Sequence, residues 1–406
     1  MRDQGDPSDD PTEPAVAELF SQPAWRRWTA ASLLSRLPVS MALLAFVLAG
    51  QQSLESAAQG SVLAGLIGFV AGLLGPWAGR RLDRTEVRAA LQRRLVVAGL
   101  MMGVVAALVH QRAGFLSLIV AVVIMSAALA GMMAGFRSLL LVVVQTSVRG
   151  HSHYVESMMV EFGYAVGPLI VTGIYLATNI EVVLSSMSAI FLVAAILLRK
   201  IPEMFVEQVV HTDPGFAVSR TTLRVAALGF AVSTGFGIVE GSVALRMSSI
   251  GLPTSSSGPF LLLLGVGSCI GGMYVSLRPM RTSRRRLRAG QLLIAFAVTL
   301  QPYAWASTTL GLGASLIVAS IPLVPLNGLL SSLIEAEAGP NNRSTLFAVF
   351  LTAIMVGGGV GVALGGVLSS TLAPTGPALI SSTLYAAMGS IILIQAVFRR
   401  AIGPTL

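Results

Sequence analysis

The stretch Gly65-Leu-Ile-Gly68-Phe-Val-Ala-Gly72-Leu-Leu-Gly75-Pro-Trp-Ala-Gly79 places glycines three and four residues apart along an apolar run. Residues at this spacing share one face of a helix, so that face carries no side chains. In lipid, such a face lets two helix backbones approach closely. The stretch therefore predicts a membrane-spanning helix that packs against another helix through bare backbone.

Glycines at a related spacing return in every third apolar segment. The fifth, eighth and eleventh segments contain Gly163, Gly167 and Pro168; Gly265, Gly267, Gly271 and Gly272; and Gly357, Gly361 and Gly365. We expect segments 2, 5, 8 and 11 to be interface helices of a six-helix unit that is used twice. Two similar bundles that meet along smooth faces suit a transporter whose halves rock against each other.

Composition independently indicates a membrane protein. The chain has 406 residues, of which 54% are hydrophobic and 11% charged, whereas about a quarter of a soluble domain is charged. Reading apolar runs of about 20 residues as spans predicts an all-α polytopic membrane protein of about twelve transmembrane helices in two pseudo-symmetric six-helix bundles. The expected spans are 27–50, 58–79, 95–110, 115–138, 154–177, 180–198, 224–245, 257–278, 289–308, 311–333, 344–369 and 374–398.

The longest internal polar segment divides these spans equally. We therefore expect a disordered cytoplasmic tail over 1–24, an N-terminal bundle over 25–200 and a cytoplasmic linker over 201–223. A C-terminal bundle over 224–400 and a short cytoplasmic tail over 401–406 would follow.

The net charge of +9 is concentrated in alternate loops. This is the positive-inside pattern, and it predicts that both termini are cytoplasmic. Because the basic runs are short turns between spans, a nucleic-acid partner is not expected. Lys200 is the only lysine, a bias that favours a bacterial protein in the cytoplasmic membrane.

No residue constellation indicates catalysis. Cys269 is the only cysteine and lies in an apolar span, and the four histidines lack metal-ligand spacing. Phosphate-binding loops and nucleophile elbows are absent from the sequence. We expect no enzyme activity, no cofactor and no metal site, and a monomer whose partners are the bilayer, protons and a small-molecule substrate.

A few charges interrupt the apolar spans. Arg36, Arg137 and Glu161 fall at depths that would place them together in the cytoplasmic half of the first bundle, and Glu240 lies towards the outer side of segment 7. A charge at the centre of a span costs roughly 2.5–3.5 kcal/mol on insertion scales, so these residues are the candidate site. Glu161 is the expected proton carrier, and Arg36, Arg137 and Glu240 are expected to bind substrate. The alternatives are a structural ion pair at Glu161 and a local pairing of Glu240 with Arg246.

The loop after the second segment resembles a signature of the major facilitator superfamily. Gly75-Pro-Trp-Ala-Gly79-Arg-Arg-Leu-Asp83-Arg84 matches the family's loop between helices 2 and 3, with glycine, three residues and then Asp-Arg. The usual continuation of glycine and basic residues is replaced by Glu86-Val-Arg88. The resemblance spans residues 25–400, and it implies that Gly79, Asp83 and Arg84 form a conformational switch rather than a substrate site.

The fifth segment resembles the helix 5 signature of that family's proton-coupled exporters. Gly163-Tyr-Ala-Val-Gly167-Pro168 carries its core, although Val171 and Thr172 replace the glycine pair that usually follows. The resemblance implies a central cavity lined by helices 1, 4, 7 and 10. It favours secondary active export of a drug or metabolite in exchange for protons. Proton-coupled uptake of an anionic metabolite, a transport-inactive membrane sensor or scaffold, and a channel remain as alternatives.

Overall fold

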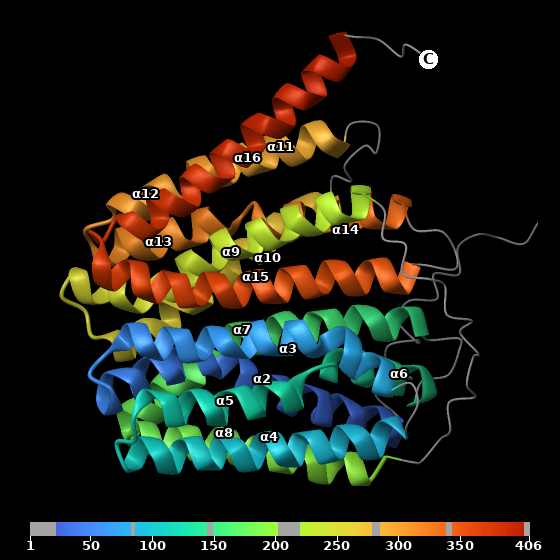
Figure 1. Cartoon of the computed structure of the whole chain (residues 1–406), viewed down its shortest axis with the longest axis vertical. Coiled ribbons are helices and arrows are strands. Elements are labelled where there is room, and N and C mark those ends of the chain that lie inside the picture. The colour runs from blue at the N-terminus through green and yellow to red at the C-terminus, as the bar shows by residue number, and fades with distance from the viewer. Residues whose placement is uncertain are drawn as a thin grey trace, which may run out of the picture.

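The structure, a computed structural model, describes residues 22–82, 86–143, 149–201, 220–277, 285–337 and 343–401. These ranges form a bundle of long, roughly parallel helices (Figure 1). In chain order the helices of the N-terminal half are α2 (Pro23–Ser53), α3 (Ala57–Leu82), α4 (Val87–His110), α5 (Phe115–Leu129), α6 (Met132–Val143), α7 (Arg149–Ala177) and α8 (Ile180–Arg199). Those of the C-terminal half are α9 (Arg220–Ser249), the 3-10 helix η2 (Thr254–Ser256), α10 (Ser257–Leu277), α11 (Arg285–Thr299), α12 (Gln301–Trp305), α13 (Thr309–Ser320), α14 (Leu323–Glu337), α15 (Arg343–Thr371) and α16 (Gly376–Ala401).

These helices account for the twelve expected spans, and the predicted fold class is confirmed. Four spans are each built from two consecutive helices: α5 with α6, η2 with α10, α11 with α12, and α13 with α14. The first helix begins at Pro23 and α9 begins at Arg220, each a few residues before the expected start. The rest of the two predicted tails and of the linker, residues 1–21, 202–219 and 402–406, lies outside the described residues.

The two ends of the bundle differ in character. At one end, here called the hairpin end, short turns at 54–56, 111–114, 178–179, 250–253, 306–308 and 372–375 join consecutive spans. At the opposite end, here called the arginine end, the helices begin or end near Arg27, Arg80, Arg199, Arg220 and Arg343. Helix α2 begins and α16 ends at the arginine end, on the right of Figure 1.

Two arginines, one half-buried and one buried, donate hydrogen bonds to backbone carbonyls at helix interruptions. Between α5 and α6, Gly131 has a left-handed backbone with φ of 72°, and the freed carbonyl of Ala130 accepts a hydrogen bond from Arg94 of α4. At the C-terminal end of α12, Arg246 of α9 donates to the carbonyls of Ala304 at 3.0 Å and Ala306 at 2.6 Å. A broken helix in a membrane needs such donors, because lipid supplies none.

The two halves meet along two seams. One joins α3 to α15, and the other joins α7 to α10. Each seam runs along the bundle from the hairpin end to the arginine end. The two helices of each seam are antiparallel.

Candidate functional site

A central cavity of about 440 Å³ lies between the two halves. Helices α2, α3, α5, α6 and α7 line it from one side, and α9, α10, α14 and α15 from the other. Its size falls in the range of small-molecule sites. The interruptions in the fourth and tenth spans place Met132, Met133 and Leu323 in its wall.

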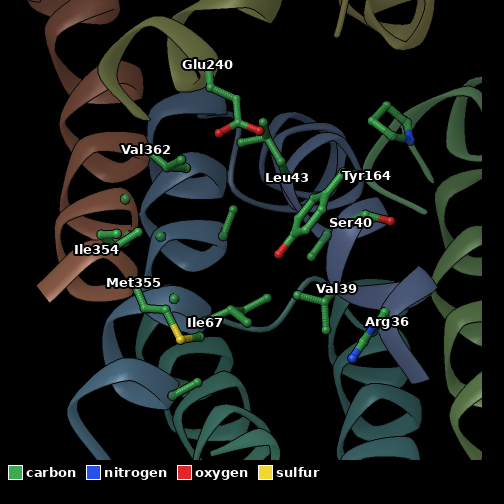
Figure 2. A pocket seen from close by; sticks show the side chains of 18 of the residues that line it. Arg36, Val39, Ser40, Leu43, Ile67, Tyr164, Glu240, Ile354, Met355 and Val362 are labelled. Atoms are coloured by element: carbon green, nitrogen blue, oxygen red, sulfur yellow. The ribbon is translucent and has the colours of Figure 1, made fainter. Parts of the chain in front are cut away.

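Most of the wall is apolar, and two charged side chains face the cavity. Among the described lining residues these are Arg36 of α2 and Glu240 of α9. Figure 2 shows them at opposite sides of the cavity, with Tyr164 and Leu43 between them. Arg36 lies on the arginine-end side of the middle of α2, whereas Glu240 lies on the hairpin-end side of the middle of α9. The cavity therefore offers one cation and one anion at different depths and on different halves.

The start of α2 is fixed by two tryptophans, which hold the helix that carries Arg36. Trp25 and Trp28 are completely buried, and their rings stack at 5.2 Å between centroids. The Trp28 Nε1 donates a hydrogen bond of 3.0 Å to the carbonyl of Phe136 on α6. Because Phe136 also lines the cavity, this bond ties the two walls together.

The structure describes two side chains of the expected charge cluster, Arg36 and Arg137. Arg36 lines the cavity, whereas Arg137 of α6 is exposed and is not among the lining residues. The backbone of Glu161 belongs to α7, but its side chain lies outside what the structure describes, as do Asp83 and Arg84. Among the intramembrane charges whose side chains the structure describes, Arg36 and Glu240 line the cavity.

Glu240 and Arg246 do not pair with each other in the described structure. Arg246 is 8% exposed, and its guanidinium contacts the carbonyls after α12 and the hydroxyl of Ser249. Glu240, one and a half turns away on the same helix, faces the cavity instead. The alternative of a local ion pair is therefore replaced by two separate roles.

The glycines of α3 contact the other half over part of their stripe. A Cβ built on Gly65 would meet the carbonyl oxygen of Gly359, and one built on Gly72 would lie 2.9 Å from the Cβ of Met355, both on α15. Gly68 lies against the same helix. In contrast, no described atom outside their own helix lies within 4 Å of a Cβ built on Gly75 or Gly79.

The other expected interface glycines contact helices of their own half. Gly357, Gly361 and Gly365 lie against the α9 carbonyls of Phe230, Thr234 and Ile238. Glycines displaced around α15, Gly359 and Gly366, are the ones that face α3. The structure thus differs from the expectation for α15, because this helix has glycines on two faces and uses one face for each neighbour.

In the fifth and eighth spans, too, some residues contact helices of their own half and others contact the other half. Gly167 lies against Ser40 of α2, and Gly271 lies against the Ile321 carbonyl, so both serve contacts within a half. The seam between α7 and α10 instead uses Pro168, whose carbonyl lies where a Cβ on Gly258 would be. Further along that seam, Gly265 faces Ala165 at 3.6 Å from its built Cβ.

At the hairpin end, three hydrogen bonds join the halves within the described residues. The Thr254 hydroxyl donates to the Gln51 Oε1 at 2.6 Å. The Thr172 hydroxyl donates to the carbonyl of Ser255 at 2.9 Å and accepts from the Gly258 N–H at 3.1 Å. Together with the glycine contacts of α3 and α15, these bonds hold the two halves together on the hairpin-end side of the cavity.

Tyr164 lines the cavity, although the sequence analysis assigned it no role. It is 53% exposed, and Figure 2 shows its ring in the cavity between Glu240 and Arg36. A signal was available, because Tyr164 precedes the lining residue Pro168 by four positions and so shares its helix face. Most other lining residues are ordinary apolar side chains that no local pattern marks.

Comparisons with known proteins agree with this architecture. A profile of the Major Facilitator Superfamily matches residues 28–362. The solved nucleoside transporter NupG covers 93% of this chain and 98% of its own, with 13% identity and a TM-score of 0.69. The human organic anion transporter MFSD10 (TETRAN) covers 91% and 99%, with 15% identity and a TM-score of 0.62.

A bacterial homologue of the human lysosomal transporter Spinster, in an inward-facing and occupied conformation, is similar as well. It covers 92% of this chain and 94% of its own, with 16% identity and a TM-score of 0.65. No curated protein sequence matches the chain. The structural likenesses show a shared fold, and the profile covers more than half of the residues. The chain belongs to the major facilitator superfamily, whose twelve-helix architecture and central cavity it has.

Proposed function

We propose that this protein is a proton-coupled secondary transporter that exports a small organic molecule, with the arginine end and both termini in the cytoplasm of a bacterium. The observation that carries the proposal is the cavity lined by both halves, with ionisable groups in an apolar wall. Transporters of this architecture place substrate at the interface of their repeats and expose it to each side in turn. The contacts between the halves at the hairpin end support a cycle in which this side is closed while substrate enters from the cytoplasm.

Glu240 is the described residue best placed to exchange a proton. Ionisable groups at membrane depth are costly and are retained for function by default. The Glu240 carboxyl faces the cavity, where water and substrate reach it in turn. Glu161 stays a second candidate, because it precedes the lining residues Tyr164, Ala165 and Pro168 by three, four and seven positions on α7.

Export is favoured by the helix 5 signature and by the apolar wall, which suits molecules that partition into membranes. Uptake of an anionic metabolite is the second candidate, because Arg36 lines the cavity. The two directions differ in the sign of the coupling. An exporter moves substrate against protons, whereas a proton symporter moves both in the same direction.

The test is proton movement in proteoliposomes that contain a trapped pH-sensitive dye. A panel of small amphipathic amines, carboxylic acids and zwitterions is added under an imposed pH gradient. We expect at least one compound to drive proton exchange by the wild type. Glu240→Gln removes the carboxyl group that exchanges the proton, and it should therefore reduce this exchange by roughly tenfold or more. A tenfold loss of rate corresponds to a rise of about 1.4 kcal/mol in the barrier. Glu161→Gln is measured in parallel.

The control is Glu55→Gln, which makes the same chemical change at an exposed turn of the hairpin end and should leave the exchange unchanged. Glu240→Asp keeps a carboxyl group and should keep part of the exchange, which separates lost chemistry from misfolding. Full proton coupling in Glu240→Gln would remove this residue from the mechanism. The absence of proton exchange with every compound in the panel would remove proton coupling.

A further inference from the structure

Two spans of the cavity wall are interrupted, and the interruptions differ in whether a helix can close them. In the tenth span the carbonyl of Ile321 would bond the N–H four residues on, but that residue is Pro325, which has no N–H. In the fourth span the corresponding residue after Ala130 is Ala134, and residues 115–143 contain no proline. A continuous helix is therefore possible in the fourth span and not in the tenth.

Two features stabilise the interruption of the fourth span. Gly131 has φ of 72°, in the left-handed region that favours glycine. A side chain at this position would also be crowded, because a Cβ built there lies 3.1 Å from the Cβ of Ala78 on α3. Arg94 of α4 donates a hydrogen bond to the Ala130 carbonyl, and lipid has no donor that could replace it. The glycine thus permits the bend, and Arg94 replaces the helix bond that the bend removes.

The interruption also determines where part of the cavity wall lies. Met132, Met133 and Phe136 follow it directly and line the cavity. The Phe136 carbonyl accepts a hydrogen bond of 3.0 Å from Trp28, which anchors α6 one turn later. Successive residues of a helix are rotated by about 100° about its axis, so a continuous fourth span would turn the residues after Gly131 relative to α5. Met132 and Met133 would then leave their present positions.

We propose that the interruption of the fourth span is a hinge of the transport cycle, and that Arg94 is the positioning residue that selects between its two forms. In the broken form Arg94 binds the Ala130 carbonyl. In the continuous form the N–H of Ala134 takes its place. A ligand that contacts the methionines of the broken form favours that form by its difference in affinity for the two. This link to the ligand rests on the function proposed above, whereas the two forms themselves do not.

The hinge lies against the part of α3 that contacts no described residue of the other half. A Cβ built on Gly131 lies 3.2 Å from the backbone nitrogen of Gly79, whereas one built on Gly79 meets no described atom within 4 Å outside its own helix. When the arginine end closes, this part of α3 has the other half on one side and the hinge on the other. Closure at the arginine end is thereby transmitted to the methionines of the cavity wall.

The test is hydrogen–deuterium exchange of the full chain in detergent. The first N–H groups of a helix have no partner within it, so the amides of residues 131–134 exchange in the broken form and are protected in the continuous one. Arg94→Met keeps an apolar stem but leaves the Ala130 carbonyl without its donor in the broken form only. We expect the ratio of continuous to broken form to rise by ~10- to 100-fold, so these amides should exchange more slowly than in the wild type.

Three further variants make this result specific. Arg94→Lys keeps a donor and should exchange more nearly like the wild type. Arg93→Met is the matched control, because exposed Arg93 donates to the Ala89 carbonyl of its own helix at 3.3 Å. Ala134→Pro removes the N–H that the continuous form needs, at a position in the first turn of α6. Added to Arg94→Met, it should return the amides of residues 131–133 to the wild-type rate.

A merely structural role of Arg94 predicts a change of the opposite sign, because Arg94→Met would then loosen α5 and α6 and speed their exchange throughout. That result, or unchanged exchange at residues 131–134, overturns the proposal. Proton exchange in proteoliposomes, with the panel described above, is measured on the same variants. Arg94→Met and Ala134→Pro should both slow it, since each favours one form, and full proton exchange in both would reject the hinge as a step of transport. The expected deuterium result in a protein that exchanges no protons would keep the hinge and reject the proposed function.

Discussion

At the hairpin end the two halves are joined by hydrogen bonds and by backbone contacts, whereas towards the arginine end the same helix α3 has glycines that contact no described residue of the other half. Gly65 and Gly79 belong to one uninterrupted stripe in the sequence, yet one contacts α15 and the other does not. A stripe longer than its contact is expected of a surface that is used fully only when the other end closes. The difference is what the proposed function would require if the halves pivot along the stripe, and the predictions below test that pivot.

The largest effect is expected from a cross-link that locks the closed end. Gln51→Cys together with Thr254→Cys, in a Cys269→Ser background, places two thiols where a hydrogen bond of 2.6 Å now joins the halves. Cross-linking with a short bifunctional thiol reagent should abolish proton-driven flux in proteoliposomes almost completely, because opening of the hairpin end would need the bond to break.

A cleavable reagent makes the experiment its own control, since reduction should restore the flux. The single Gln51→Cys variant, treated in the same way, should keep it. If the cross-linked double variant transports at the rate of the untreated protein, the hairpin end does not open during transport and the pivot is rejected.

A smaller effect is expected from filling the stripe at its two ends. In Gly359→Val, the new side chain meets the backbone of Gly65 and Phe69 on α3. Overpacking of this kind costs about 1–3 kcal/mol, so thermal unfolding in detergent should occur at a clearly lower temperature. Gly75→Val meets no described neighbour and should unfold near the wild-type temperature.

Flux should respond differently from stability in this pair of variants. Gly75→Val should transport more slowly in spite of its stability, because its side chain obstructs closure at the arginine end. A Gly75→Val variant with full flux would show that this part of α3 never meets the other half. Equal loss of stability in both variants would remove the difference between the two ends.

How much of the structure can be predicted from the sequence depends on the kind of contact. Hydropathy predicts the spans because lipid requires long apolar helices with satisfied backbones. Glycine spacing indicates that α15 packs closely, but Gly357 and Gly359 lie on different faces, and spacing does not say which neighbour each face meets. That choice is made by tertiary packing against α9 and α3.

The candidate site was predictable to a similar degree. Arg36 and Glu240 are conspicuous as charges within apolar runs, and both line the cavity. Arg246 is equally conspicuous, yet it binds the carbonyls that follow α12. The interruption that creates this need, between α11 and α13, leaves no mark in average hydropathy, so the sequence did not distinguish a structural arginine from one in the site.

The smallest effect, and the most specific to the closed end, is expected from Thr172→Val. This substitution keeps the shape of the side chain but removes the bond to the Ser255 carbonyl and leaves the Gly258 N–H without its acceptor. A buried donor without a partner costs about 1–3 kcal/mol, and here that cost falls on the closed hairpin end rather than on either half alone. The open arrangement should gain population, which is measured as faster labelling of Thr254→Cys, a position buried at the closed end, by a membrane-impermeant maleimide in the Cys269→Ser background. Thr178→Val is the matched control, because the Thr178 hydroxyl donates to the Ile174 carbonyl of its own helix at 2.6 Å. If both valine variants leave the labelling rate unchanged, the Thr172 bonds do not hold the halves together, and the closed end depends on the other contacts between the halves.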